Sequence, residues 1–263
     1  MKPRVAYAEV SWVHVDLPSV YSACCATSST SEMASSVVVS APGKVILHGE
    51  HAVVYGKAAL ATSVDLRCYV VLKQVEDATI TLDLPDFDHH VQWSLLTISS
   101  LHTLQTATEM TELKELAGVT SESPATQNTA TLVFLYLLTH ICREKLAEFP
   151  GLSATVISTL PASAGLGSSA AFSVSLAAGF LSLIGEVSPN QRLNKPLQQQ
   201  ATVESERGSA KVGLPMSVMQ RLDKLGIGVS GSVCTGWSAS EMEVINEWGL
   251  KAEKLIHGTP LWD

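Results

Sequence analysis

The stretch Pro161-Ala-Ser-Ala-Gly-Leu-Gly-Ser-Ser-Ala-Ala171 decides the fold, because it joins a strand-like segment to a helix through a loop of small residues. Before it, Ser153-Ala-Thr-Val-Ile-Ser-Thr159 has the β-branched side chains of a strand, and 168–184 is an apolar run without proline, typical of a buried helix. The first N–H groups of such a helix have no acceptor within it and point at the loop. With the positive end of the helix dipole they form a site for a phosphate, although glycine is also common in purely structural turns.

Two common nucleotide-binding patterns are absent. Six residues separate Gly49 from Gly56, and alanine follows Lys57, so no Gly-x-x-x-x-Gly-Lys-Ser/Thr occurs. No Gly-x-Gly-x-x-Gly opens a βαβ unit either. Two other segments accompany the loop instead: Ser40-Ala-Pro-Gly-Lys-Val-Ile-Leu-His-Gly-Glu-His-Ala-Val-Val-Tyr-Gly56 and Glu253-Lys-Leu-Ile-His-Gly258.

The first of these segments and the glycine loop, in this order, resemble the GHMP kinases, the family of galactose, homoserine, mevalonate and phosphomevalonate kinases. The amino-acid sequences of segments 41–51, 132–137 and 253–258 most resemble those of the mevalonate kinases of animals. The resemblance covers roughly residues 36–188 and resumes at about 240–258. Two long motifs in the right order are a far more specific signal than either glycine loop alone.

Composition limits the classes of function. Hydrophobic residues make up 46% of the 263 positions, which is enough for one large domain or a two-lobed unit. The net charge of −8 argues against a nucleic-acid or membrane-surface role, and no apolar segment is long enough for a bilayer. The five cysteines are odd in number and lack zinc spacing, and His89-His90 is interpreted as a polar loop pair. We therefore expect a cytoplasmic protein, and the resemblance allows a peroxisomal association.

The pattern of elements predicts an α+β fold. Strands are expected at 37–39, 45–47, 80–84 and, with half-buried alternation, at 64–72, and helices at 126–146 and 168–184. The resemblance implies the GHMP kinase N-terminal domain, a fold like domain 2 of ribosomal protein S5. In that fold the helices pack on one face of a mixed sheet.

Four parts are expected along the chain. Residues 1–34 form an N-terminal extension that we expect to be disordered, and 35–188 form the ATP-binding N-terminal domain. Residues 189–237 lose the periodic pattern and are interpreted as an atypical, flexible insertion. Residues 238–263 begin with a capping box, Ser238 to Glu241, and continue as a helix. The resemblance implies that the C-terminal GHMP domain is absent.

The resemblance assigns a nucleotide and metal site residue by residue. The residues that it implies contact ATP, the co-substrate, are Lys44, Asp86, Ser158, Ser163, Ala164, Gly165, Leu166, Gly167, Ser168 and Ser169. Asp86 occupies the position at which the family has an asparagine, and its negative charge is less favourable near ATP. The implied ligands of Mg²⁺ are Ser169 and Glu253, a sparse set of the kind that this cation prefers.

The same resemblance implies a substrate site at Lys44, Glu50 and His51, with Lys44 as the catalytic cation beside the attacking hydroxyl. The family continues His-Gly-x-Pro-Ser-Gly-x-Asp-Asn, where this chain reads His257-Gly-Thr-Pro-Leu-Trp-Asp263. The aspartate that acts as general base falls one position beyond the last residue. We therefore expect a truncated chain with impaired turnover.

The implied activity is ATP-dependent phosphorylation of mevalonate to 5-phosphomevalonate, a step toward isoprenoid and sterol precursors. Two alternatives remain: a non-catalytic ATP-binding fragment or regulatory isoform, and another small-molecule kinase of the GHMP family. Mevalonate and ATP are the expected ligands, with a homodimer as one option. Neither nucleic acid nor membrane is an expected partner.

Overall fold

The structure is a computed structural model that describes residues 22–26, 36–52, 55, 57–100, 106–118, 123–161, 164–187, 214–227, 232–234 and 237–256. Its strands are β1 (Ser22–Ala26), β2 (Ser36–His48), β3 (Leu60–Gln74), β4 (Thr79–Leu84), β5 (His89–Ser94), β6 (Leu152–Ser158) and β7 (Ser232–Cys234). Its helices are α1 (Leu95–Ser100), α2 (Thr106–Leu116), α3 (Ala125–Ile141), α4 (Ser168–Leu183), α5 (Met216–Lys224) and α6 (Ala239–Ile256). Two short 3-10 helices are η2 (Pro85–Phe87) and η4 (Leu146–Glu148).

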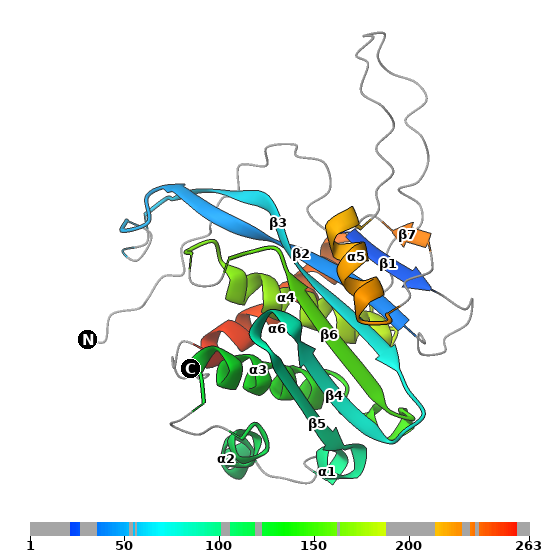
Figure 1. The fold of residues 1–263 in the computed structure, drawn as a ribbon. Coiled ribbons are helices and arrows are strands. Elements are labelled where there is room, and N and C mark those ends of the chain that lie inside the picture. Colours follow the sequence, from blue (N-terminus) through cyan, green and yellow to red (C-terminus); the bar gives the residue numbers. More distant parts are fainter. Residues whose placement is uncertain are drawn as a thin grey trace.

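The strands form one mixed sheet in the order β5-β4-β6-β3-β2-β1-β7 (Figure 1). Every neighbouring pair is antiparallel except β4 and β6, which run parallel. The carboxyl ends of β4 and β6 therefore meet at one edge of the sheet. Asp86, two residues after β4, and Ser158, the last residue of β6, are brought together there. The predicted α+β class with a mixed sheet is confirmed.

Helices α3, α4 and α6 cover one face of the sheet, which we call the inner face (Figure 1). Phe134 on α3 is fully buried in this layer, and its ring lies 6.0 Å from that of Trp93 on β5 and 5.7 Å from that of Phe180 on α4, measured between centroids. The side chains buried between this face and its helices are mostly apolar, as in a protein core. No helix in the described part of the chain combines the length and the apolar character that a bilayer crossing requires.

Helix α5 covers the opposite face, which we call the outer face (Figure 1). Its Val218 and Leu222 are buried against side chains of β2, β3 and β6, namely Val38, Tyr69, Val71 and Ile157. The half-buried alternation expected for 64–72 is therefore wrong: Leu66, expected on the buried side, is exposed, and the second half is buried on both sides. Residues 68–72 are buried on both faces, because α5 covers the side that the sequence pattern left to solvent.

Three segments that were expected to lack secondary structure contain helices or strands. Ser22–Ala26, in the extension expected to be disordered, forms β1 and pairs with β2 and β7. The segment expected to be a flexible insertion supplies α5 and β7. His89 and His90 lie in β5 rather than in a loop, and His89 Nε2 is 2.8 Å from the hydroxyl of Thr131. Pairing with distant strands accounts for β1 and β7, pairing with the neighbouring β4 accounts for β5, and packing on the outer face accounts for α5.

Candidate functional site

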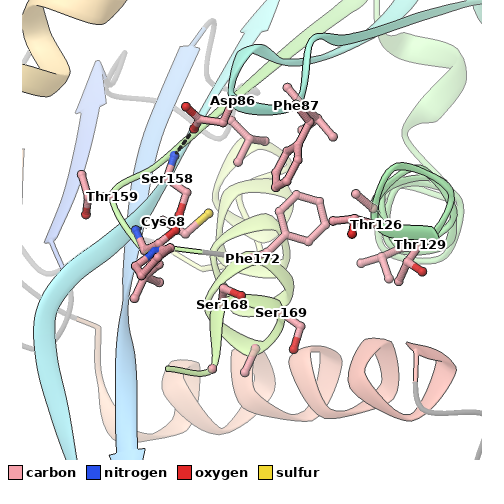
Figure 2. A pocket seen from close by; sticks show the side chains of 18 of the residues that line it. Cys68, Asp86, Phe87, Thr126, Thr129, Ser158, Thr159, Ser168, Ser169 and Phe172 are labelled. Carbon is pink, nitrogen blue, oxygen red and sulfur yellow. Dashed lines mark hydrogen bonds between the residues drawn. The ribbon is translucent and has the colours of Figure 1, made fainter. Parts of the chain in front are cut away.

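A cavity of about 890 Å³ opens on the inner face, between the glycine loop, η2 and the ends of α3, α4 and α6 (Figure 2). It gathers most of the residues singled out in the sequence: Lys44, Asp86, Ser158, Gly165, Gly167, Ser168, Ser169 and Glu253. These residues come from β2, η2, β6, the loop, α4 and α6. A single concave surface thus collects polar groups that are more than 200 residues apart in the chain.

The glycine loop is held against β2 by close backbone approaches. The backbone N–H of Lys44 donates to the carbonyl oxygen of Leu166 at 2.8 Å. A Cβ on Gly43 would lie 2.7 Å from that same oxygen, so only glycine fits at this crossing. Gly167 caps α4 with φ of +69°, and a Cβ there would lie 2.8 Å from Cγ of Lys44. Because Gly167 has no side chain, the stem of Lys44 can cross the start of the helix.

The start of α4 lies in the wall of the cavity. The first helical hydrogen bond runs from Ala171 N–H to the carbonyl of Gly167, and no side chain among the described residues caps the helix. The N–H groups of Ser168, Ser169 and Ala170 therefore have no acceptor within the helix, and all three residues line the cavity. With the positive end of the dipole, they suit a phosphate group.

Glu253 reaches the start of α4 because α6 packs unusually close to it. A Cβ on Gly249 would lie 2.7 Å from Cγ2 of Val174, so a larger residue would separate the two helices. One turn later along α6, Glu253 Oε2 accepts from Ser169 Oγ at 3.3 Å, and Oε1 accepts from Ser173 Oγ at 3.5 Å. Helix α6 itself begins with the predicted capping box, which is confirmed by the mutual hydrogen bonds of Ser238 and Glu241.

The donor set at this junction fits Mg²⁺. Ser169 supplies a hydroxyl oxygen and Glu253 a carboxylate, and both line the cavity beside the start of α4. Mg²⁺ usually takes one or two protein carboxylates and completes its shell with water and phosphate oxygens. Among the described residues, no group of three or more His, Cys, Asp or Glu side chains forms a metal site.

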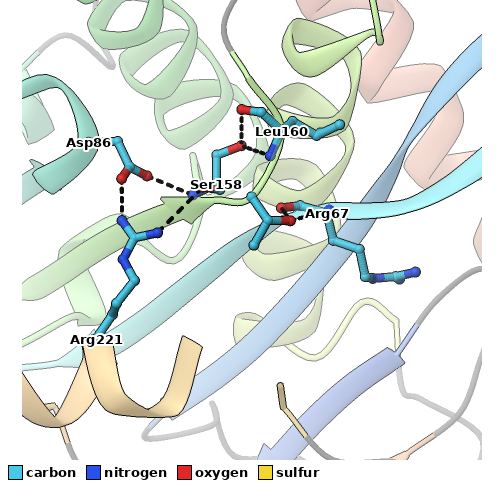
Figure 3. A network of polar contacts seen from close by, with 6 residues as sticks. Arg67, Asp86, Ser158, Leu160 and Arg221 are labelled. Atoms are coloured by element: carbon cyan, nitrogen blue, oxygen red, sulfur yellow. Dashed lines mark hydrogen bonds and ion pairs between the residues drawn. The ribbon is translucent and has the colours of Figure 1, made fainter. Parts of the chain in front are cut away.

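Asp86 lies in a closed network at the edge of the cavity (Figure 3). One carboxylate oxygen accepts from the backbone N–H of Ser158 at 2.8 Å, and the other pairs with the guanidinium of Arg221. Arg221 Nη1 also donates to the carbonyl of Ser158 at 3.4 Å. Ser158 Oγ in turn accepts from Leu160 N–H at 3.0 Å, which shapes the start of the glycine loop.

Some predicted residues lie elsewhere. Glu50 and His51 are exposed in the turn after β2, with His51 Nε2 3.4 Å from Glu50 Oε1, and neither lines the cavity. Ala164 is exposed and also outside the lining, whereas Leu166 contributes its carbonyl to the contact with β2. Ser163 lies outside the described residues.

Sequence reasoning missed the apolar end of the cavity. Phe87 and Phe172 face this end, and Thr126 and Thr129 of α3 line it (Figure 2). Cys68 also lines it, but burial raises the pKa of its thiol to about 12, which keeps it protonated and unreactive. No motif marks these positions. Arg221 was missed as well, since nothing in the sequence relates it to Asp86.

The sequence of this chain also matches known proteins. Residues 130–221 match the family described as GHMP kinases N terminal domain. The chain is 36% identical over 233 residues to the mevalonate kinase of Homo sapiens and to that of Bos taurus, covering 85% of this chain and 49% of each relative. It therefore spans about half the length of the curated relatives it matches.

Among solved structures, the mevalonate kinase of Methanococcus jannaschii superposes with a TM-score of 0.41 and 22% identity, over 56% of this chain and 40% of that one. The family match, with the relatives of Homo sapiens and Bos taurus, shows that the chain carries a GHMP kinase N-terminal domain.

Proposed function

We propose that this chain binds Mg-ATP in the inner-face cavity and is the nucleotide-binding part of a kinase that phosphorylates mevalonate. The observation that carries the proposal is the hydrogen bond between Ser169 and Glu253 beside the N-terminus of α4. It brings together the hydroxyl and carboxylate oxygens that we propose as Mg²⁺ ligands, beside the N–H groups that we propose for the phosphates. The relatives named mevalonate kinase support mevalonate as the acceptor.

Each residue has a defined task in this proposal. The N–H groups at the start of α4 hold the phosphates, and Ser169 and Glu253 hold the cation. Mg²⁺, when bound, neutralises charge on the phosphate oxygens. Lys44, whose stem crosses Gly167, directs an ammonium toward the γ-phosphate and the attacking hydroxyl. Positioning and charge neutralisation are the main requirements of phosphoryl transfer.

The placement of Asp86, Ser158, Phe87 and Phe172 supports a nucleotide along the rest of the cavity. The two aromatic rings give an apolar end, and the polar pair stands at its edge. Glu50 and His51 are proposed to contact the acceptor, as the resemblance implies. In this chain they lie on the β2–β3 hairpin, outside the cavity lining.

Titration of the full chain with a fluorescent ATP analogue, with and without Mg²⁺, tests nucleotide binding. Glu253→Gln keeps the shape but removes the charge, and we expect it to weaken Mg-dependent binding by about tenfold. The matched control is Glu247→Gln on the same helix, whose carboxylate pairs with Lys251 and does not line the cavity. A chain that binds no ATP refutes the proposal, and unchanged binding by Glu253→Gln refutes the metal assignment.

A coupled assay of ADP release then tests the acceptor. Mevalonate, galactose, homoserine and phosphomevalonate are offered in parallel with Mg-ATP. Turnover with mevalonate alone supports the proposed activity. ATP binding without turnover on any acceptor favours the alternative, a non-catalytic nucleotide-binding protein. Turnover with another acceptor assigns the chain to a different kinase of the family.

A further inference from the structure

The network around Asp86 joins the two faces of the sheet. Helix α5 packs on the outer face through Val218 and Leu222, whereas Asp86 and Ser158 line the cavity on the inner face. Arg221 is adjacent to Leu222 on α5, and its side chain reaches the sheet edge where β4 and β6 end (Figure 3). A helix on the outer face therefore contributes a cation to the edge of the inner-face cavity.

The charge of Asp86 makes this contact significant. Its side chain is 29% exposed and lines a cavity proposed to hold a triphosphate. The chain already carries a net charge of −8, so an unpaired carboxylate here would repel the ligand. An arginine and an aspartate together present no net charge, as would the asparagine that the family resemblance implies at this position.

We propose that Arg221 is a positioning residue of the nucleotide site: it neutralises and orients Asp86, so that an aspartate can line a cavity for a polyanionic nucleotide. The inference rests on the proposed binding of ATP. Arg221 acts through Asp86, whose other oxygen is held by the N–H of Ser158. Segment 214–227 is thus part of the nucleotide site, although it lies on the other face of the sheet.

The second contact of Arg221 is the weaker one. Its Nη1 is 3.4 Å from the carbonyl of Ser158, near the upper limit for a hydrogen bond. That carbonyl belongs to the residue whose Oγ also contacts Leu160. The ion pair with Asp86, in contrast, involves two full charges in close contact. We therefore expect the charge of Asp86, rather than the shape of the loop, to dominate the effect of removing Arg221.

A double-mutant cycle separates these contributions. Mg-ATP affinity is measured for the full chain, Arg221→Ala, Asp86→Asn and the double variant, using the fluorescent analogue. Arg221→Ala should weaken binding about five- to tenfold when Asp86 is present. In the Asp86→Asn background the same substitution should change affinity by less than about twofold, because no charge is left to neutralise.

Ionic strength provides an independent measurement. The loss caused by Arg221→Ala should shrink between low and high salt, since screening weakens the repulsion of the exposed carboxylate. Lys224→Ala is the matched control, because it removes the same charge from an exposed position of the same helix. It should leave affinity within about twofold of the unchanged chain.

Three results overturn the inference while ATP binding to the unchanged chain still stands. One is unchanged affinity in Arg221→Ala. Another is an equal loss with and without the Asp86→Asn substitution, which would mean that Arg221 only holds α5 in place. A third is a loss as large in Lys224→Ala, which would indicate a general charge effect. Absence of ATP binding to the unchanged chain would refute the proposed function itself, and this inference with it.

Discussion

The two faces of the sheet differ in how they are covered and in what they contribute. The inner face is packed by α3, α4 and α6 around a broad core and carries the glycine loop and the cavity. The outer face is covered by α5, which buries Val218 and Leu222 among four sheet residues. Yet the outer helix supplies Arg221 to the cavity edge. A small packing layer can thus contribute a charged side chain to a cavity that a larger layer lines.

If the inner face is the main core, truncating its centre should have the largest effect on stability. Phe134→Ala removes a fully buried ring packed between Trp93 and Phe180, and should lower the free energy of unfolding by about 4 kcal/mol. Denaturant unfolding followed by circular dichroism measures it. Leu96→Ala, at a side chain that is 80% exposed, should stay within about 0.5 kcal/mol. A cost below that of the outer-face variants would contradict this ranking.

Truncation on the outer face should have a smaller and more local effect. Leu222→Ala should cost about 2 to 3 kcal/mol and release α5 from the sheet. Hydrogen exchange should then show faster exchange in α5 while α3 keeps its protection. Met219→Ala, at a side chain of α5 that is 41% exposed, is the matched control. Equal loss of protection in α3 would show that the two faces unfold as one unit.

The close crossing of α4 and α6 predicts a medium effect confined to the inner face. Gly249→Ala places a methyl group 2.7 Å from Cγ2 of Val174, and should cost about 1.5 kcal/mol despite the better helix propensity of alanine. It should also weaken Mg-dependent ATP binding, because Glu253 moves away from Ser169. Adding Val174→Ala should restore both properties; failure of that rescue would show that the crossing is not set by this contact.

The smallest expected effect is the dependence of folding stability on pH, which arises from two neighbouring residues of β3. Burial raises the pKa of the Cys68 thiol from 9.0 to about 12, and burial also raises the pKa of Tyr69, whose side chain packs in the outer-face cluster. Above pH 9 the unfolded chain loses the Cys68 proton while the folded chain keeps it, so stability falls between about pH 9 and 12. From pH 8 to 9.5 this thiol should cost about 0.8 kcal/mol. Urea unfolding at both pH values measures it, and Cys68→Ala should reduce the slope.

The segments predicted well are those whose structure follows from local pattern. Residues 153–159 and 168–184 were expected as strand and helix, and β6 and α4 occupy almost the same ranges. The capping box at Ser238 was expected for the same reason, because both of its partners lie within one turn. The capping box and the hydrogen bonds of α4 join residues a few positions apart, whereas β6 was recognised by its β-branched residues although its partners, β3 and β4, are distant.

Only some of the residues expected at the site line the cavity. Ser169 and Glu253 were paired through the family resemblance, and their hydroxyl and carboxylate are 3.3 Å apart. Arg221 was not associated with Asp86, from which it is 135 residues away. Glu50 and His51 were expected at the substrate site but lie in an exposed turn outside the cavity lining. Side chains so far apart in the chain meet only through the packing of whole elements.

Glycines at defined positions, alternating apolar side chains and a serine-glutamate cap specify strand, loop and helix here, because such signals act on the backbone within one or two turns. The pairing of β1 with β2, the burial of both faces at 68–72 and the contact of Arg221 with Asp86 arose only when the layers assembled. These contacts depend on which face each helix covers. The hydrophobic effect is non-directional, so an apolar helix face does not by itself specify which face of the sheet it covers. The packing of the complete fold decides this.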